Sequence, residues 1–252
     1  MFHRKKRSIF SRVIFWTILV LIFLLLFRNC CRNLIDDCDG SSLIKKNATI
    51  IIDPGHGGFD GGAEGLYNIV EKDINLQISL KLKDMLSCVG FKTVLIRDGD
   101  YSIEDDCTLP IAGRKTSDLN NRLKFCSDYE NPIFLSIHQN KFEQSNCSGT
   151  QIFYGRHDNR SEILARELQH NFQNDVNEHN KREIKKGDKN LFLLYNAKCP
   201  IVLIECGFIS NPQEAKLLSD ESYQAKISFV IMKSLLNFID KTAESTFFRF
   251  KF

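Results

Sequence analysis

Apolar runs that resemble buried strands alternate with helical patterns along most of this chain. The run at 49–52 (TIII) is β-branched and shows no alternation with polar residues, which is typical of a strand buried on both faces. Similar runs follow at 132–138 (PIFLSIH) and 200–205 (PIVLIE). Strands alternating with helices predict an α/β domain: a mostly parallel (mixed) sheet with helices on both faces.

Helices are expected between these strands. The segment from Glu71 carries an apolar stripe that Gly90 ends, and Asn211 followed by Pro212 is an N-cap signature. The remaining expected elements are a strand at 91–97, a short helix at 118–126, a strand at 149–154, a long helix at 161–180 and a last helix at 223–239.

The N-terminus predicts a membrane anchor. Basic residues at 4–7 precede an apolar run at 13–27 (VIFWTILVLIFLLLF), and a basic flank favours a cytoplasmic N-terminus with the rest of the chain exported. A cleaved signal peptide is the alternative, but 28–32 (RNCCR) contains no small-x-small cleavage site. We therefore divide the chain into a basic tail and transmembrane helix (1–32), a linker (33–47) and an extracytoplasmic domain (48–245).

Charge and cysteine content exclude two function classes. Residues 1–32 hold 7 of the 34 basic residues and no acidic one, so 27 basic residues face 31 acidic ones in the remainder, a formal charge near −4. A nucleic-acid-binding domain normally has the opposite sign. The nine cysteines form no C-x-x-C pair, which argues against a cysteine zinc knuckle and against a complete disulfide framework.

Three residues that can bind a metal lie at expected strand ends or helix starts. His56 follows the first strand within a turn (DPGHGG), Glu71 opens the first helix, and His138 closes the strand at 132–138. Two imidazoles and one carboxylate are the ligand set of an open catalytic zinc site, whose fourth position is left for water. Taken singly, each residue is also explained as an ordinary polar residue at the end of an element.

Glu205 is the candidate base. It ends the apolar run at 201–204, so it is carried to the same sheet edge and partly desolvated there, which raises a carboxylate's pKa toward the range of a general base.

Four segments resemble the motifs of the third family of N-acetylmuramoyl-L-alanine amidases. They are 51–63 (IIDPGHGGFDGGA), 71–73 (EKD), 135–140 (LSIHQN) and 204–212 (IECGFISNP), in the family's order. The resemblance implies a phosphorylase/hydrolase-like fold, Zn²⁺ held by His56, Glu71 and His138, and Glu205 as the catalytic carboxylate. It also implies the substrate, the amide between N-acetylmuramic acid and L-alanine in peptidoglycan.

Within the family, the segment 113–123 (GRKTSDLNNRL) looks most like the germination-specific branch that acts on the spore cortex. That branch implies a place in the cell wall or spore intermembrane space, and an activating lipoprotein partner or a homodimer. Two departures stand out: Gln139 occupies a position that is small in many relatives, and 182–190 (REIKKGDKN) matches poorly.

Several alternatives stay open on the sequence. They are a non-catalytic peptidoglycan-binding protein on the same fold, a vegetative division or autolysis amidase, a carboxypeptidase, and a glycosidase using Asp53 with Glu205. Asp53 is otherwise a turn residue or a partner that orients His56. Arg97 and Arg122 could bind a stem-peptide carboxylate or be surface charges or structural pairs.

Overall fold

A computed structural model describes residues 47–249, with side chains described up to residue 243. The predicted membrane anchor and nearly all of the predicted linker lie outside these residues. Within the described part, no helix is both long and apolar enough to cross a bilayer.

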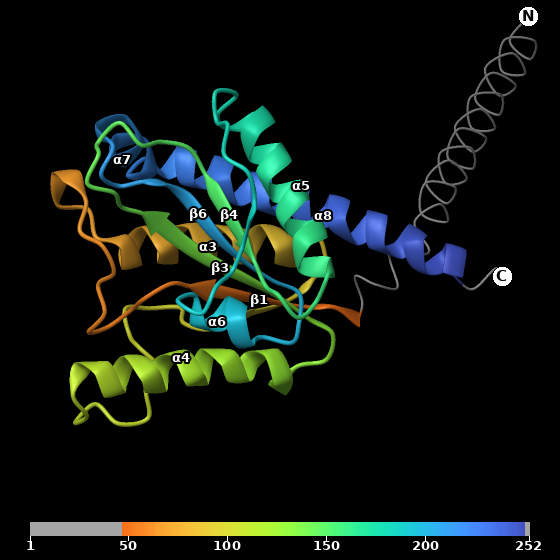
Figure 1. Ribbon diagram of the computed structural model, residues 1–252, viewed down its shortest axis with the longest axis horizontal. Coiled ribbons are helices and arrows are strands. Elements are labelled where there is room, and N and C mark those ends of the chain that lie inside the picture. Colours follow the sequence, from red (N-terminus) through yellow and green to blue (C-terminus); the bar gives the residue numbers. More distant parts are fainter. Residues whose placement is uncertain (1–46, 250–252) are drawn as a thin grey trace, which may run out of the picture. The chain divides into compact units, whose positions relative to one another are not determined.

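Six strands form one mixed sheet in the order β2-β1-β3-β6-β4-β5 (Figure 1). The first four in that order run parallel, β4 lies antiparallel to β6, and β5 lies parallel to β4. The mostly parallel sheet predicted from the sequence is therefore confirmed, with β4 and β5 running opposite to the other four strands. In chain order the strands are β1 (Thr49–Pro54), β2 (Lys92–Leu95), β3 (Pro132–Asn140), β4 (Gln151–Tyr154), β5 (Lys185–Lys186) and β6 (Ile201–Phe208).

One face of the sheet is covered by three long helices, α3 (Glu71–Cys88), α5 (Arg160–Asp175) and α8 (Glu221–Arg249) (Figure 1). Alternate strand residues point into this larger core because side chains alternate between the two faces of a strand. Ile52, Leu135 and Val202, which are register partners across β1, β3 and β6, are fully buried in it.

The other face has a thinner cover, made by α4 (Ile111–Asp128) and the five-residue α6 (Phe192–Asn196) (Figure 1). Ile51, Phe134 and Ile201 form the centre of this second core, and Leu119 from α4 packs against it. Helices therefore cover both faces, as predicted.

The elements differ from the prediction mainly at their ends. The helix expected at 118–126 begins at Ile111, directly after Pro110, and the helix expected to reach 180 ends at Asp175. The sequence pattern did not indicate β5, α6 or the 3-10 turn η1 (Leu66–Asn68), because each is too short to show a period.

The predicted cap at Asn211 is confirmed. Its side chain accepts hydrogen bonds from the backbone N–H groups of Gln213 and Glu214 at the start of α7 (Pro212–Leu218). The Glu214 side chain points to the sheet edge. There it accepts hydrogen bonds from the backbone N–H groups of Phe208 at 2.7 Å and Gly149 at 2.8 Å. The turn after β6 is thus fixed at both sides.

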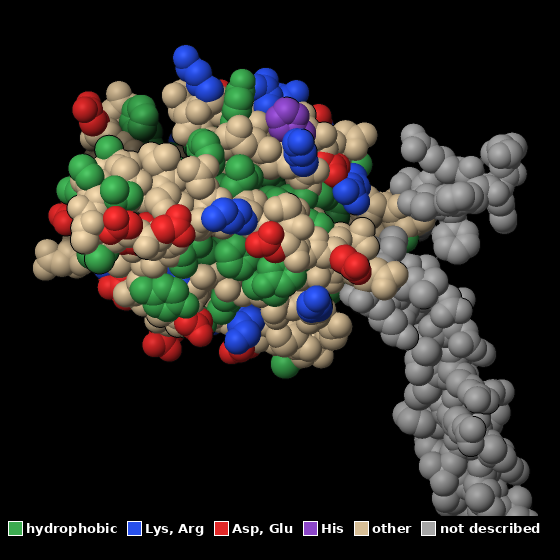
Figure 2. Space-filling view, turned by 90° about the horizontal axis from the view of Figure 1, so that it is seen from below, with side chains coloured by type: hydrophobic (Ala, Val, Ile, Leu, Met, Phe, Trp, Pro, Cys, Tyr) green, Lys and Arg blue, Asp and Glu red, His purple; other side chains and the backbone are tan. Residues whose placement is uncertain are grey.

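The face on the α4 side carries charges of both signs, but they are not mixed evenly. Figure 2 shows acidic side chains gathered toward the left of the view and basic ones toward the right. The loop between β2 and α4 contributes to the negative charge with five acidic residues in 98–106 (DGDYSIEDD).

Packing of α5 against the sheet and α8 supplies a test of the larger core. Phe172 is fully buried in it, whereas Phe229 on α8 is 52% exposed. We expect Phe172→Ala to lower the free energy of unfolding by about 3–5 kcal/mol, because it leaves a cavity. Phe229→Ala should change it by less than about 0.5 kcal/mol. Urea denaturation of both variants measures this; equal losses would contradict the assignment of the core.

Candidate metal centre

The sheet brings the candidate residues to one edge. Parallel strands end at the same edge, and β3 and β6 are neighbours in which His138 and Glu205 are register partners. His56 lies two residues beyond the end of β1, and Glu71 is the first residue of α3, at the same edge. The predicted positions of His56 after the first strand and of Glu71 at the start of α3 are confirmed. The other two strands are longer than predicted, because β3 continues two residues beyond His138 and β6 three residues beyond Glu205.

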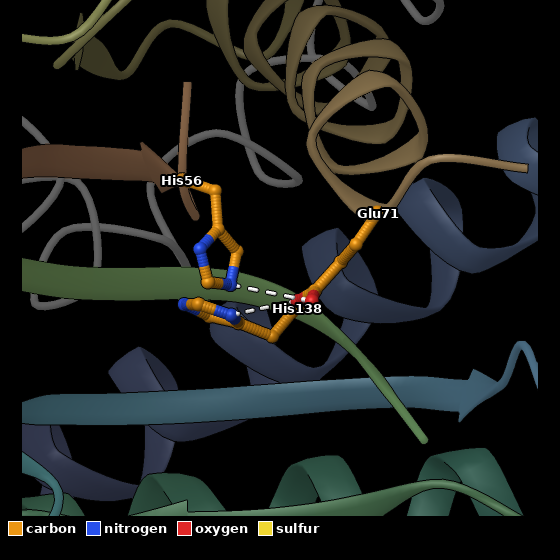
Figure 3. A group of neighbouring side chains, drawn as sticks. All are labelled: His56, Glu71 and His138. Carbon is orange, nitrogen blue, oxygen red and sulfur yellow. Dashed lines mark hydrogen bonds and ion pairs between the residues drawn. The ribbon is translucent and has the colours of Figure 1, made fainter. Parts of the chain in front are cut away.

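His56, Glu71 and His138 converge (Figure 3). The two carboxylate oxygens of Glu71 are shared between the histidines: Oε2 lies 3.2 Å from Nε2 of His56, and Oε1 lies 3.0 Å from Nδ1 of His138. The rings meet edge to face, with centroids 5.0 Å apart. One ligand atom from each residue lies within 4.8 Å of the others.

The loop that carries His56 is held by two buried arginines. Arg97 is 1% exposed and donates to the carbonyls of Pro54, Gly55 and His56. Arg122, 2% exposed, donates to the carbonyls of Pro54 and His56 as well. These bonds hold His56 at φ 63°, a left-handed conformation that is uncommon outside glycine.

These contacts decide between the two roles left open for Arg97 and Arg122. Their guanidinium groups are buried, and their donors are occupied by backbone carbonyls and, for Arg122, by the carboxylates of Asp53 and Asp118. Neither is a surface charge, and neither presents a free fork to a substrate carboxylate. Both are structural.

Asp53 also has a structural role. It is 1% exposed, forms an ion pair with Arg122, and accepts a hydrogen bond from the Ser136 hydroxyl at 2.7 Å. It is not the partner of His56, and both of its oxygens already have a partner within the fold. The geometry therefore gives no support to the glycosidase alternative.

Asp60 is the residue that orients His56. Its Oδ2 lies 3.0 Å from Nδ1 of His56. A carboxylate only accepts, so Nδ1 carries the hydrogen and Nε2 is directed to Glu71. A histidine that binds a metal commonly donates its other ring N–H to a carboxylate in this way.

Glu71 is held by the backbone and by amide side chains. Ala63 N donates to Oε2 at 2.9 Å, and Gln139 N donates to Oε1 at 3.1 Å. The Asn75 amide lies 3.4 Å from Oε1, and its own oxygen accepts from the Gln139 side chain at 3.1 Å. Gln139, the unusual residue of the third motif, is therefore part of the support of Glu71.

Two glycines leave room for the rings. A Cβ at Gly55 would lie 2.3 Å from the ring of His138, so any side chain there would displace that imidazole. Gly62 has φ 71° and a Cβ there would lie 2.6 Å from Glu71 Oε2. Gly55 and Gly62 are thus required by close approach.

The pKa values of His56 and Glu71 are shifted by the hydrogen bonds and charges between them. Burial would lower the pKa of His56, but hydrogen bonds to Asp60 and Glu71 outweigh it and raise that pKa to about 9. Burial would raise the pKa of Glu71, yet the hydrogen bonds from His138 and His56 hold that pKa well below its usual value. The centre therefore favours positive charge between the imidazoles and the carboxylate.

Glu205 differs from the other three. Its Oε2 is buried and has no hydrogen-bond partner among the described residues. Burial raises the pKa of Glu205 to about 7; the charges of His138 and His56 oppose this rise, and that of Glu71 adds to it. A partly buried carboxyl group with such a pKa can take up and release a proton near neutral pH.

The donor set fits zinc. Two imidazole nitrogens and one carboxylate oxygen are a common three-residue zinc set, and the ligands of one tetrahedral ion at about 2.1 Å are roughly 3.4 Å apart. The observed separations require only small adjustments to reach that geometry. The orienting carboxylate on His56 and the hydrogen bonds to Glu71 supply the surrounding support that such sites use.

A cavity of about 230 Å³ opens beside the histidines on the α4 side of the sheet. His56 and His138 line it together with residues of the His56 loop, α4 and α6. A larger cavity of about 490 Å³ lies around 154–162 and contains none of the four candidate residues. We take the smaller one as the entrance to the candidate site because it reaches the imidazoles.

Sequence reasoning missed Asp60, Asn75 and the supporting role of Gln139. Asp60 follows His56 by four residues in the same glycine-rich turn, and Asn75 follows Glu71 by one helical turn. These spacings were visible in the sequence. Their meaning was not, because it depends on how the turn folds back over the helix.

Fold and site together define a class: an α/β protein whose sheet edge carries two histidines, a carboxylate able to share an ion with them, and a second, partly desolvated carboxylate. Comparison with known proteins gives the family. The model of the N-acetylmuramoyl-L-alanine amidase family matches residues 50–237, and the chain belongs to this family of peptidoglycan amidases.

Individual relatives support the same family assignment. The chain is 32% identical over 241 residues to the germination-specific N-acetylmuramoyl-L-alanine amidase of Bacillus subtilis (strain 168), covering 96% of this chain and 98% of the relative. Its fold is similar to the CwlD amidase from Clostridioides difficile in complex with the GerS lipoprotein, with 39% identity, a TM-score of 0.72, and coverage of 76% of this chain and 98% of that one. An N-acetylmuramoyl-L-alanine amidase from Clostridium difficile 630 is 29% identical, with a TM-score of 0.66 and coverage of 77% and 98%.

The ion pair beneath the His56 loop predicts a pH dependence of stability. Burial would raise the pKa of Asp53, but Arg122 and Ser136 outweigh it and lower that pKa. The stabilisation is therefore fully present above the unfolded value near 3.8 and is lost as the pH falls through the lowered folded value. At pH 7, we expect Asp53→Asn to cost about 3–5 kcal/mol, because Arg122 is left buried without its partner.

That penalty should shrink at pH 3 and below. Urea denaturation at both pH values, with a chelator present so that metal release does not contribute, measures the difference. Asp128→Asn, on the exposed end of α4, is the control and should change stability little at either pH. A penalty for Asp53→Asn that is equal at both pH values would contradict this account.

Proposed function

We propose that the chain is a zinc-dependent amidase that hydrolyses the bond between N-acetylmuramic acid and L-alanine, with His56, Glu71 and His138 as metal ligands and Glu205 as the proton-transfer group. The convergence of these ligands beside a partly buried carboxylate at one sheet edge is the observation that supports it. Bound zinc would polarise the substrate carbonyl and activate a water molecule.

The protein side of the reaction follows from the positions of the residues. Asp60 fixes the ring of His56, and the N–H groups of Ala63 and Gln139 fix the carboxylate of Glu71. Glu205 stands beside His138 on the neighbouring strand, and its Oε2 has no partner among the described residues. That oxygen is available to accept a proton from the attacking water and to donate it to the departing alanine nitrogen.

The alternative of a non-catalytic peptidoglycan-binding protein is less favoured. A binding protein has no need of an orienting partner on His56 or of an unpartnered carboxylate next to the centre, and both are present. The two proposals differ in products. An amidase releases peptides with a free alanine amino group and no new reducing sugar ends, whereas a binding protein releases neither.

Glu205→Gln tests the base. The substitution keeps the size and a hydrogen-bonding oxygen but removes the group that takes up the proton, so we expect turnover of peptidoglycan to fall by about 10²–10⁴-fold. Zinc content and melting temperature should stay near those of the parent. Release of amino-terminal alanine measures turnover, and metal analysis of the purified chain measures zinc.

His138→Ala is the contrasting variant, because it removes a ligand: zinc content should fall together with turnover. Glu221→Gln, an exposed carboxylate at the start of α8, is the matched control for Glu205→Gln and should behave as the parent. Parental turnover by Glu205→Gln would remove Glu205 from the mechanism. Full zinc content in His138→Ala would remove His138 from the ligand set.

For the biological setting, we propose spore cortex maturation by a membrane-anchored enzyme whose catalytic domain is extracytoplasmic. The similarity to a germination-specific amidase over nearly the whole of both chains supports the cortex, and the basic and apolar N-terminal segment supports the anchor. The related amidase bound to the GerS lipoprotein supports an accessory lipoprotein, with a homodimer as the alternative. A vegetative division or autolysis role is the competing proposal.

Deletion of the gene separates these roles. Loss of a cortex amidase should leave vegetative growth and cell separation normal while the spores lack muramic lactam, since lactam formation requires stem-free muramic acid. Cortex composition by chromatography of digested spores measures the outcome. Chained or lysis-resistant vegetative cells with normal spore cortex would favour the division or autolysis role.

A further inference from the structure

The cavity beside the histidines combines an apolar wall with charged groups. Phe59, Leu119 and Leu193 provide the apolar part. The charged residues that line it, besides the histidines, are Asp53, Asp60, Lys115, Asp118 and Arg122. Which of these charges can reach a ligand depends on what each already binds.

Three of the charges are neutralised internally. Arg122 is buried and binds both Asp53 and Asp118, the latter with Nε 2.6 Å from Oδ2. Asp118 also accepts from the backbone N–H of Ile103 at 2.8 Å. This group supports the His56 loop and offers no free charge to the cavity.

Lys115 is different. Its side chain is 50% exposed, and its ammonium lies 3.0 Å from Oδ1 of Asp60, which is its ion-pair partner among the described residues. An ammonium has three donors, so further acceptors can bind without breaking this pair. The other oxygen of Asp60 contacts His56. The Lys115 ammonium and the His56 ring, a candidate metal ligand, therefore bind the same carboxylate.

The apolar wall is fixed, and the neighbouring arginine is not available. Arg114 stacks on the ring of Phe59, with its guanidinium carbon 3.8 Å from the centroid, and its Nε lies 3.0 Å from Glu104. Arg114 therefore stabilises Phe59 and is neutralised by Glu104. Lys115 remains as the exposed cation among the residues lining the cavity.

The surroundings make this cation unusual. The adjacent loop at 98–106 carries five acidic residues, and acidic side chains gather on one side of the α4 face (Figure 2). Lys115 therefore lies next to a loop whose charged residues are all acidic. A single ammonium beside an apolar wall can discriminate one carboxylate at one place.

We propose that Lys115 is a specificity-determining residue that binds a carboxylate of the stem peptide, while the peptide backbone lies along Phe59, Leu119 and Leu193. This inference rests on the proposed amidase function. In peptidoglycan, the residue after L-alanine is a glutamate linked through its side chain, which leaves its α-carboxylate free. That carboxylate follows the scissile amide by one residue, a short reach that matches the position of Lys115 beside Asp60 and His56.

Binding of two small peptides to the full-length, zinc-loaded chain tests this. The peptides are L-alanyl-D-glutamate γ-methylamide, whose α-carboxylate is free, and the same peptide with that carboxylate converted to an amide. We expect the parent to bind the free acid about tenfold more tightly, which corresponds to one charge-assisted contact of about 1.4 kcal/mol. Calorimetric titration measures both affinities.

Variants assign the preference to Lys115. Lys115→Met and Lys115→Gln should bind both peptides equally, whereas Lys115→Arg should keep part of the preference. Lys124→Met, which removes an exposed lysine from the same helix that does not line the cavity, is the control and should match the parent. Zinc affinity by chelator competition should stay within about twofold in all four, because Asp60 keeps its contact with His56.

Two results would overturn the assignment. Equal binding of both peptides by the parent would show that no carboxylate is recognised, and a preference that persists in Lys115→Met and Lys115→Gln would assign it to another group, such as the metal. Neither measurement requires turnover. Hydrolysis of a muramoyl peptide by the parent is scored separately, so a failure of the proposed amidase function is distinguishable from a failure of Lys115.

Discussion

The site depends on two buried guanidinium groups. Among the residues that the structure describes, Arg97 has no carboxylate within hydrogen-bonding distance. It donates instead to five backbone carbonyls, three of them in 54–56 and one at Lys72 in the first turn of α3. Arg122 donates further hydrogen bonds to carbonyls of the same loop and forms ion pairs with Asp53 and Asp118. Buried charge is costly unless it is fully hydrogen-bonded, so the loop carbonyls and the arginines require each other.

This mutual requirement explains how His56 tolerates its backbone conformation. A non-glycine residue in the left-handed region costs on the order of 1 kcal/mol or more, and it persists only where the surroundings determine it. Here the carbonyl of His56 is bound from two directions, by Arg97 and Arg122. The first turn of α3, which begins with Glu71, is bound by the same Arg97. Two of the three candidate ligands are thus positioned by one side chain.

The sequence was sufficient to predict the architecture and to place the four candidate residues near one another, but for different reasons. Buried parallel strands are visible as uninterrupted apolar runs, such as 201–204, and their carboxyl ends must meet at one edge. His138 and Glu205 could therefore be placed together. The metal-ligand roles depended on the family motifs, since a single histidine at a strand end is usually an ordinary polar residue.

The roles of Arg97, Arg122 and Asp53 could not be predicted. Apart from Gly99 and Asp118, which lie two and four positions away, their partners lie between 25 and 83 positions away along the chain. Most of these partners are backbone carbonyls, which leave no trace in side-chain identity. An arginine that binds a substrate and an arginine that binds a turn look the same in one sequence. Only the fold distinguishes them.

The two faces of the sheet divide the tasks of the molecule. The face under α3, α5 and α8 contains the larger core, and its fully buried residues reach across β1, β3 and β6. His138 and Glu205 lie two positions beyond Ser136 and Leu203 along their strands, so they share the opposite face. In the described part of the chain, the helices that cover this face are α4 and the short α6. Because that cover is thin, a cavity remains where these strands end. The larger core and the cavity therefore lie on opposite sides of the same strands.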